Sequence, residues 1–448
     1  MLPSTLQQQG EPICAMATPP GRGALAIVRL SGQGALEIAH QLTHKKLLAR
    51  QAIYTKFYDD NDEVIDQGIV IYFQAPASFT GEDVVELHCH GNPIVSDLLL
   101  KTLCAQGSRL ATPGEFSQRA FVNNKIDLAQ AEAIADLISS TTEQGVRMAT
   151  RSLQGAFSIR VRAVLATLIL IRTNIEAHLD FPDEEINVKQ VQEIATKLTQ
   201  LCTEVTELMQ QAQQGERLQT GATIAIAGKP NVGKSSLINA LAQSDIAIVT
   251  EIPGTTRDPL TADIELHGMP VRLIDTAGLR DTANVIELKG IERTQQALSQ
   301  ADITLWLSDA SQTETPQIAP ADIEENKTIW VHNKIDLTKL QASTSANHIY
   351  LSVKTGVGLP ELLTMIASKL HADEQGDTPF LARRRHLIAL QQAQQNIQAA
   401  GVRISAPTEL ELAAEDLRLA QLSLGEVTGE FTSDDLLGRI FSEFCIGK

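Results

Sequence analysis

The chain has 448 residues and a formal net charge of −17 at pH 7, from 37 basic and 54 acidic side chains. That length exceeds what one hydrophobic core supports and predicts several domains. The acidic balance excludes a broadly electropositive protein, so contact with nucleic acid would need a local patch or a partner. Five scattered cysteines without a CxxC spacing, and a start without a basic and apolar leader, predict a cytoplasmic protein with reduced thiols.

Residues 1–122 are predicted to form an α+β domain, because short β-rich runs alternate there with turn residues. ALAIVRLSG and GIVIYFQAP are typical of strands, and SFTGEDVVELHCHGNP indicates a turn, a strand and a second turn. The HCH motif, residues 88–90, suggests a metal site at first sight. Adjacent side chains of a strand point to opposite faces, so we expect a structural role for it.

Residues 123–219 and 377–448 are predicted to be helical. IDLAQAEAIADLISS places most of its apolar side chains on one helical face, and Pro182 in DFPDEEINV is the expected break. AVLATLILI, residues 163–171, is too short to cross a bilayer, so we interpret it as a buried helix and expect no membrane partner. The two helical stretches are expected to pack together as one discontinuous domain.

Residues 220–376 lie between these stretches and have a different pattern. Five apolar runs, ATIAIAG, VRLIDTAG, ITLWLSD, TIWVHNKID and IYLSVK, alternate with helical segments. This alternation predicts a parallel sheet with helices on both faces. The expected fold class is therefore α/β plus all-α: an inserted α/β domain, a discontinuous helical domain and an α+β domain.

GKPNVGKSS, residues 228–236, fits the phosphate-binding pattern G-x4-G-K-[ST] between a strand and a helix. Its glycines let backbone amides approach phosphate oxygens, and the helix N-terminus favours the anion. We expect Lys234 to reach the β- and γ-phosphates and the Ser235 hydroxyl to bind Mg²⁺.

Three further motifs follow in the order that GTPases use. In DTAG, Asp275 can hold Mg²⁺ through water and the Gly278 amide can contact the γ-phosphate. In NKID, Asp336 can accept hydrogen bonds from both N1–H and the N2 amine of guanine, a pair that adenine lacks. SVK, residues 352–354, stands where GTPases place a loop that supports the base. The four motifs together predict GTP as the nucleotide.

The water-orienting glutamine of Ras-like enzymes is missing, since Leu279 follows DTAG. Either hydrolysis is very slow or another group does this work. Asn231 and the hydroxyls and carbonyls of residues 250–258 can hold a monovalent cation against the phosphates. Glu287 either orients water or is a solvated carboxylate, and the residues alone leave both interpretations open.

Several segments are more specific than any GTP motif: ATPPGRGALAIVRLSG, SFTGEDVVELHCHG, TPGEFSQRAFVNNKIDLAQAEAIADLI, LQGAFS, DFPDEE, GKPNVGKSSLINAL, PGTTRD, DTAGLR, GIERT, FLARRRHL and GEFTSDDLLGRIFSEFCIGK. Through them the chain resembles the MnmE (TrmE) family of tRNA-modification GTPases along essentially its whole length. The resemblance implies an N-terminal tetrahydrofolate-binding and dimerisation domain, a helical domain and an inserted Ras-like P-loop GTPase domain. It also implies a homodimer, tRNA as substrate and the FAD-dependent protein MnmG as partner.

The implied activity is a potassium-activated GTP hydrolysis that serves aminomethylation or carboxymethylaminomethylation at C5 of the tRNA wobble uridine (U34). The one-carbon unit would come from 5,10-methylenetetrahydrofolate or a related folate. By this resemblance, K⁺ is bound by Asn231, Thr250, Ile252 and Thr255, Mg²⁺ by Ser235 and Thr256, and folate by Arg29, Glu86, Lys125 and Lys448. The candidate catalytic residues are Glu287, which the resemblance implies, Lys234 of the phosphate loop, and Cys445, whose role stays open. The predicted GTP-binding residues are Asn231, Val232, Gly233, Lys234, Ser235, Ser236, Thr250, Glu251, Ile252, Pro253, Gly254, Thr255, Thr256, Asp275, Thr276, Ala277, Gly278, Asn333, Lys334, Asp336, Ser352, Val353 and Lys354.

The tail FCIGK places Cys445 where a prenylation box would have it, but Gly447 and Lys448 do not suit that motif. The resemblance implies that the tail lies in the folate pocket. Cys445 is then either a catalytic or a structural thiol. Two other functions remain open on the residues alone. A ribosome-assembly or signalling GTPase would share the GTP motifs, and a folate-dependent transferase acting alone would share the first domain. The basic run at residues 383–385 either contacts tRNA phosphate or is a solvated helix start.

Overall fold

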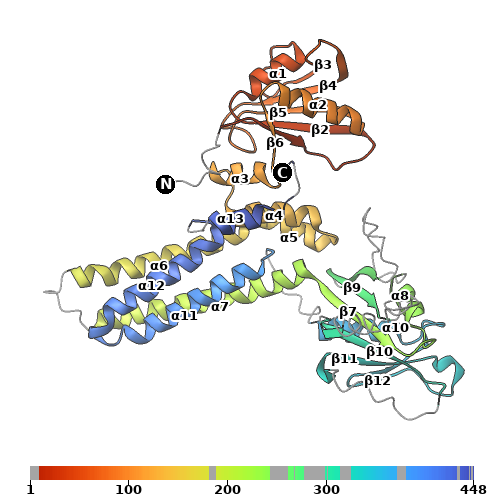
Figure 1. Cartoon of the computed structure of the whole chain (residues 1–448). Coiled ribbons are helices and arrows are strands. Elements are labelled where there is room, and N and C mark those ends of the chain that lie inside the picture. Colours follow the sequence, from red (N-terminus) through yellow and green to blue (C-terminus); the bar gives the residue numbers. More distant parts are fainter. Residues whose placement is uncertain are drawn as a thin grey trace, which may run out of the picture. The chain divides into compact units, whose positions relative to one another are not determined.

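The computed structural model describes residues 10–180, 188–242, 261–266, 268–276, 298–299, 301–312, 324–370, 380–430, 434–442, 444 and 447. The chain divides into two compact units (Figure 1). The first comprises Met1–Ala135, Ser152–Val205 and Ala389–Lys448, and the second Asp136–Arg151 and Thr206–Ile388. These borders group the chain differently from the predicted segments 1–122, 123–219, 220–376 and 377–448, which remain predictions.

The first unit begins with a six-stranded sheet in the order β3-β4-β5-β2-β1-β6, antiparallel except for the parallel pair β1 and β6. Helices α1 and α2 pack on it, and the buried cluster that includes Val28, Leu30 and Leu99 joins them to the strands. The predicted strands ALAIVRLSG and GIVIYFQAP are confirmed as β2 and β4. The elements are β1 Ile13–Met16, β2 Gly23–Ser31, α1 Ala35–Thr43, β3 Ala52–Tyr58, β4 Val64–Phe73, β5 Val84–Gly91, α2 Pro93–Ala105 and β6 Arg109–Leu110.

Strand alternation decides which residues of this sheet are available to a ligand. In β2, Ala26, Val28 and Leu30 are buried, whereas Arg29 is only partly buried on the opposite face. β5 shows the same pattern, because Leu87 and Cys89 are buried while Glu86 and His88, which alternate with them, are only partly buried. Cross-strand register then places Arg29 directly opposite Glu86. Polar side chains of two strands therefore meet on one face of the sheet.

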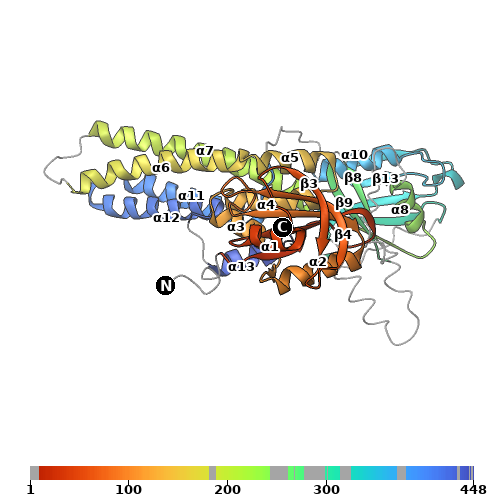
Figure 2. The same ribbon diagram turned by 90° about the horizontal axis from the view of Figure 1, so that it is seen from above.

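Long helices from both predicted helical stretches lie side by side (Figure 2). Arg172 of α6 donates to the side-chain oxygen of Gln421 of α12, and Gln398 of α11 donates to the Cys202 sulfur of α7 at 3.6 Å. These contacts confirm that segments on either side of the inserted domain pack together. The helices are α3 Glu115–Val122, α4 Leu128–Ser139, α6 Ala156–Asp180, α7 Val188–Thr220, α11 Arg384–Arg403, α12 Leu410–Thr428 and α13 Asp434–Ser442.

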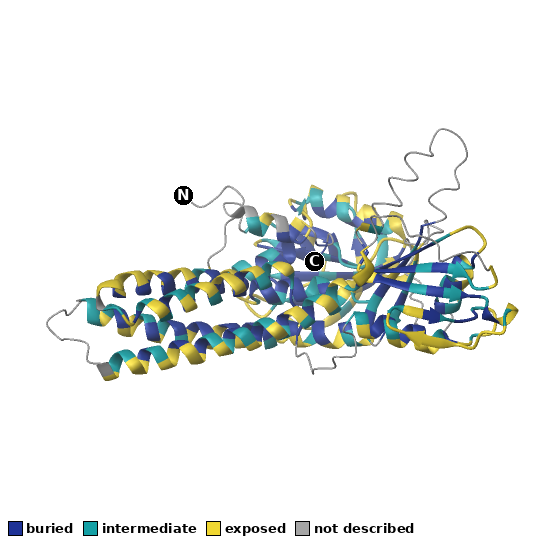
Figure 3. Cartoon of the chain, turned by 90° about the horizontal axis from the view of Figure 1, so that it is seen from below, coloured by how far each residue is buried: buried dark blue, intermediate teal, exposed yellow. Residues whose placement is uncertain are grey.

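The apolar run at residues 163–171 lies within α6, as predicted. Val161, Leu165, Leu168 and Ile175 are buried at helical spacing, while Leu170 is 73% exposed. Figure 3 shows how buried and exposed residues alternate along the long helices. In the part of the chain that the structure describes, no single helix is long and apolar enough to span a membrane. The bent pair 143–153 and 156–179 passes that test only when its two helices are taken together.

The second unit contains a seven-stranded sheet in the order β12-β13-β11-β10-β7-β9-β8. The five predicted strands are present and parallel, but β8 and β12 pair antiparallel at the two edges and were not predicted. A buried cluster including Ile226, Leu273 and Val331 forms its core. The elements are α5 Glu143–Leu153, β7 Ala222–Gly228, α8 Lys234–Ala242, β8 Thr261–Leu266, β9 Met269–Asp275, β10 Ile303–Asp309, β11 Thr328–Asn333, β12 Ser343–Ser345, β13 His348–Tyr350 and α10 Leu359–Lys369.

Candidate functional site

The predicted phosphate loop joins the end of β7 to the start of α8, which is the context that the motif requires. Gly228 has a φ of +143°, and a Cβ there would lie 2.3 Å from the Leu307 carbonyl oxygen. Gly233 has a φ of +103°, and its Cβ would lie 2.5 Å from the Asn333 amide nitrogen. Both positions therefore need glycine, and the loop stays close to two neighbouring strands. Asn231 also has a positive φ, of 64°.

Lys234 is 6% exposed, and its ammonium donates to the carbonyls of Gly228 and Lys229 at 3.0 and 2.8 Å. The side chain thus lies back over its own loop, with its charge held among oxygens where anionic phosphate is expected. At the start of α8, the Ser235 hydroxyl donates to a carboxylate oxygen of Asp275 at 3.1 Å. These two oxygens come from separate motifs and lie close enough to serve one Mg²⁺, whose ligands are hard oxygens.

The predicted base-recognition motifs meet at the carboxyl end of β11. Ser352 donates to the Asp336 carboxylate at 2.7 Å, and the Asn333 side-chain oxygen accepts from the Val353 amide at 3.0 Å. Asn333 also donates to the Val232 carbonyl in the phosphate loop at 2.8 Å. The base-recognition loop and the phosphate loop are therefore tied together before any nucleotide is considered. Lys354 follows directly along the same loop.

Sequence reasoning missed Asp309, which ends β10 beside these motifs. Its carboxylate binds the Lys334 ammonium at 2.7 Å, and the same ammonium donates to the Asn231 carbonyl at 2.7 Å. Burial by itself raises the pKa of Asp309, but hydrogen bonds from Lys334 and Ser311 outweigh it and lower the pKa. Its position at the carboxyl end of a parallel strand is the signal that could have found it.

Two further predicted residues, Ser236 and Thr276, lie next to Ser235 and Asp275 in the chain. Ser236 follows Ser235 in the first turn of α8, and Thr276 follows Asp275 and donates its hydroxyl to the Ile226 carbonyl at 2.9 Å. The remaining predicted residues lie outside the described residues, so their placement stays a prediction. They are Thr250, Glu251, Ile252, Pro253, Gly254, Thr255, Thr256, Ala277, Gly278 and Glu287.

The first unit holds the predicted folate residues Arg29 and Glu86. Arg29 donates to one oxygen of Glu86, Oε1, from Nε at 3.1 Å and from Nη2 at 2.9 Å. The guanidinium carbon also lies 5.7 Å from the ring centre of Phe79 and 5.8 Å from that of Phe116. Neither ring was foreseen from the sequence. Both rings favour this position of the cation, because a guanidinium is attracted to a ring face.

The tail reaches the same place. The Gly447 carbonyl oxygen lies 3.5 Å from Nη1 of Arg29, and a Cβ on Gly447 would lie 1.8 Å from the Met16 carbonyl oxygen. Lys125 donates to the Pro76 carbonyl at 2.9 Å, in the loop that also carries Phe79. The structure therefore brings together Arg29, Glu86 and Gly447, while Cys445 and Lys448 lie outside the described residues.

The HCH motif divides between two faces, as expected. Cys89 is buried and its thiol lies 3.5 Å from the Ala26 carbonyl oxygen, whereas His90 is exposed and binds Asp66 at 2.8 Å. Burial also raises the pKa of Cys89 and that of Cys14, the latter to about 12. Both thiols are therefore protonated at neutral pH and suit packing better than nucleophilic chemistry.

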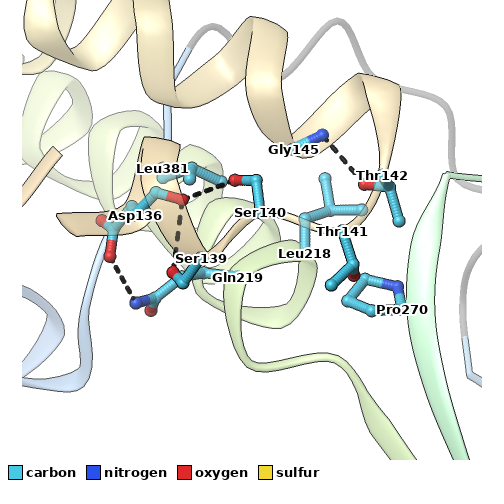
Figure 4. Close-up of a pocket in the computed structure, with 10 residues that line it drawn as sticks. All are labelled: Asp136, Ser139, Ser140, Thr141, Thr142, Gly145, Leu218, Gln219, Pro270 and Leu381. Atoms are coloured by element: carbon cyan, nitrogen blue, oxygen red, sulfur yellow. Dashed lines mark hydrogen bonds between the residues drawn. The ribbon is translucent and has the colours of Figure 1, made fainter. Parts of the chain in front are cut away.

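A small cavity of about 40 Å³ lies elsewhere in the second unit (Figure 4). It has room for about one to three waters, far less than a nucleotide or a folate needs. Asp136 is tied there to Gln219 at 2.9 Å and to Arg383 at 2.7 Å. The lining residues are Asp136, Ser139, Ser140, Thr141, Thr142, Gly145, Leu218, Gln219, Pro270 and Leu381. The Arg383 contact shows that the first arginine of the basic run is engaged within the protein.

A parallel sheet whose phosphate loop, Asp275 and NKID loop meet at the carboxyl ends of the strands defines a P-loop GTPase domain. Family models of the MnmE helical domain and of the GTP-binding protein TrmE N-terminus match residues 128–445 and 12–125. The chain belongs to the MnmE family of tRNA modification GTPases. It is a GTP hydrolase that acts in tRNA modification, which confirms the resemblance drawn from the sequence.

Individual relatives are similar in sequence to this chain along nearly their whole length. The tRNA modification GTPase MnmE of Nitrosomonas eutropha is 46% identical, covering 98% of this chain and 100% of that protein. The same-named protein of Legionella pneumophila strain Corby is 48% identical, covering 97% of this chain and 99% of that one. Among solved structures, the G domain of the T. maritima FeoB iron transporter is 26% identical at a TM-score of 0.23, covering 33% of this chain and 98% of that one.

Proposed function

We propose that this GTPase works with the FAD-dependent protein MnmG to install an aminomethyl or carboxymethylaminomethyl group at C5 of the tRNA wobble uridine, U34. The observation that carries the proposal is the pairing of Arg29 with Glu86 beside the tail, in the unit that does not contain the phosphate loop. A GTPase that acts only as a binding switch has no use for a second polar site of this kind.

The second site has the chemistry of a folate pocket. A pterin presents N–H donors to a carboxylate such as Glu86, and the glutamate tail of folate presents carboxylates to cations. We assign the pterin to Glu86, which Arg29 holds in place, and the anionic part of the ligand to Lys125 and Lys448. The one-carbon unit would be supplied by 5,10-methylenetetrahydrofolate or a related folate. Cys445 is the candidate for chemistry on that unit, with a structural thiol as its alternative.

In the GTPase site, the described residues fit GTP and Mg²⁺. Lys234 would move from its carbonyl partners to the β- and γ-phosphates, and Ser235 would join Thr256 as a Mg²⁺ ligand, with Asp275 acting through water. The set proposed for K⁺ is Asn231, Thr250, Ile252 and Thr255, and Glu287 would orient the attacking water. A cation at this position would replace the charge of an arginine finger. The active site would be completed when the two G domains of a homodimer meet across their nucleotides.

The remaining assignments follow from this reaction. The protein acts as a homodimer and meets tRNA largely through its partner, because its own charge is strongly negative. We place the reaction in the cytoplasm, where tRNA is available and where the four free cysteines of the described residues would stay reduced.

The test is a nucleoside analysis of tRNA from a strain that lacks this chain. We expect the modified wobble uridine to disappear and to return when the wild-type gene is supplied. A Lys234→Ala variant should fail through GTP and an Arg29→Ala variant through folate, the latter with GTP turnover unchanged. Wobble uridines that stay fully modified in the deletion strain would refute the proposal.

A further inference from the structure

We propose that His88 is a positioning residue of the candidate folate site, where it controls the one oxygen of Glu86 that is available to a ligand. This inference rests on the proposed folate function. It concerns a residue that carries no role in that function so far.

The first step concerns which oxygen of Glu86 can bind. Arg29 donates two hydrogen bonds to Oε1, which occupies both of its lone pairs. The rings of Phe79 and Phe116, at 5.7 and 5.8 Å from the guanidinium carbon, also favour this position of Arg29. No hydrogen bond of the described residues reaches Oε2. The acceptor left for a ligand N–H is therefore Oε2.

The second step concerns what faces that oxygen. His88 lies two residues after Glu86 on β5, so both side chains are on the same face of the strand. Its Nε2 is 3.5 Å from Oε2, just beyond a good hydrogen bond, and this nitrogen is buried without a hydrogen-bond partner among the described residues. A buried ring nitrogen without a hydrogen bond lowers the free energy of unfolding. Its position beside the carboxylate is therefore more consistent with a role at the site than with a role in stability.

The third step compares the two charge states of His88. In the neutral tautomer that carries its proton on Nδ1, which agrees with the missing hydrogen bond at Nε2, the Nε2 lone pair faces Oε2 and leaves that oxygen to the ligand. As an imidazolium, His88 donates a charge-assisted hydrogen bond from Nε2 to one lone pair of Oε2 and offsets the negative charge of the carboxylate. Charged His88 thus weakens the hydrogen bond that a folate N–H makes to the same oxygen. Protonation of His88 at lower pH should therefore weaken folate binding.

The surroundings leave Glu86 as the dominant partner of His88. The cross-strand neighbours of His88 are Ile27 on β2 and Ile69 on β4, which are apolar. Along β5 the other titratable group on this face is His90, whose ring is bound to Asp66 of β4 at 2.8 Å. Arg29 of β2 is the facing cation, and it is committed to Oε1. Within the described residues, Glu86 is therefore the acid that a charged His88 would meet.

The experiment measures equilibrium binding of 5-formyltetrahydrofolate to the full chain by calorimetry between pH 5.5 and pH 8. For wild type we expect affinity to fall by about tenfold toward the acid end, beyond the change that the ligand's own titration causes. In His88→Leu this extra loss should vanish, with affinity at pH 8 within about twofold of wild type. His90→Leu is the matched control, because it removes a histidine of the same strand, and it should keep the wild-type profile.

The outcomes separate the inference from the function on which it rests. If wild type binds no folate at any pH, the proposed folate function is wrong. If wild type binds and His88→Leu shows the same pH profile as wild type, the role of His88 is wrong and the folate function stands. Should His88→Leu fail to fold, His88→Gln replaces it, since an amide cannot gain charge and should flatten the profile in the same way.

Discussion

The buried ion network around Glu115 offers a sharp test of how the first domain is held together. One carboxylate oxygen accepts from Arg109 at 2.6 Å and from Arg119 at 3.0 Å, and the other accepts from Arg109 at 2.8 Å and from the Thr112 amide at 3.0 Å. The Glu115 side chain is 10% exposed and that of Arg119 is 9% exposed. Glu115→Gln keeps the shape of the side chain but removes the charge that the two arginines share, leaving Arg109 with Glu11 and Arg119 with Glu82.

The magnitude follows from the pKa of Glu115. Burial by itself raises this pKa, but the hydrogen bonds from Arg109 and Thr112 and the charge of Arg119 outweigh it and lower the pKa from 4.5 to about 2. At 1.36 kcal/mol for each pH unit, this difference corresponds to about 3 kcal/mol of stability at pH 7. Because the folded-state pKa is depressed, that stability is complete above about pH 4.5. It is lost as the pH falls from about 4.5 toward 2.

Hydrogen exchange of the full-length protein, followed in peptides that cover 109–122, measures the effect. We expect Glu115→Gln to lower the free energy of opening by about 3 kcal/mol at pH 7 and by less as the pH is lowered below about 4.5. The fluorescence of Trp306 and Trp330, the two tryptophans of the chain, reports the second unit and should not change.

Asp97→Asn is the matched control, because it makes the same kind of change in the same domain. Asp97 forms an exposed ion pair with Lys101, with side-chain exposures of 60% and 70%, so its loss should cost less than about 1 kcal/mol. A loss below about 1 kcal/mol in Glu115→Gln at pH 7 would refute the reasoning. So would a loss that stays constant down to pH 3.

Three other changes test the sites. Asp336→Asn should shift the ratio of the affinities for GTP and xanthosine triphosphate by at least about a hundredfold toward the latter, because an amide cannot accept both guanine N–H groups. Ser352→Ala removes only the 2.7 Å hydrogen bond to Asp336, so it should lower the affinity for GTP without this switch. GTP turnover should rise sharply in K⁺ over Na⁺, and Asn231→Ala should abolish this difference; equal rates of the wild type in both salts would remove the cation role. Gly447→Ala should weaken folate binding at least about tenfold with GTP turnover unchanged. The new Cβ would clash with the Met16 carbonyl, and the φ of +94° at this position is strained for alanine. Unchanged folate affinity would show that the tail is not part of that site.

The sequence by itself determined the chemistry of the nucleotide site. The phosphate loop is a contiguous segment whose glycines, lysine and serine act through local backbone geometry, so its pattern can be read without a fold. NKID is local in the same sense. Five parallel strands followed from apolar runs, because strands covered on both faces need continuous apolar sequence. The edge strands β8 and β12 escaped prediction because TADIEL and the fully exposed STS carry no such run.

Only the tertiary structure decided how separate segments meet. Asp309 pairs with Lys334 across 25 positions and Arg29 with the tail across 418, and no local pattern encodes contacts at such separations. The resemblance named Arg29 and Glu86, but it did not predict that Arg29 would occupy one oxygen of Glu86 and leave the other facing His88. That arrangement depends on the register of β2 against β5 and on the twofold alternation of β5. It is set by which face of the sheet buries its apolar side chains.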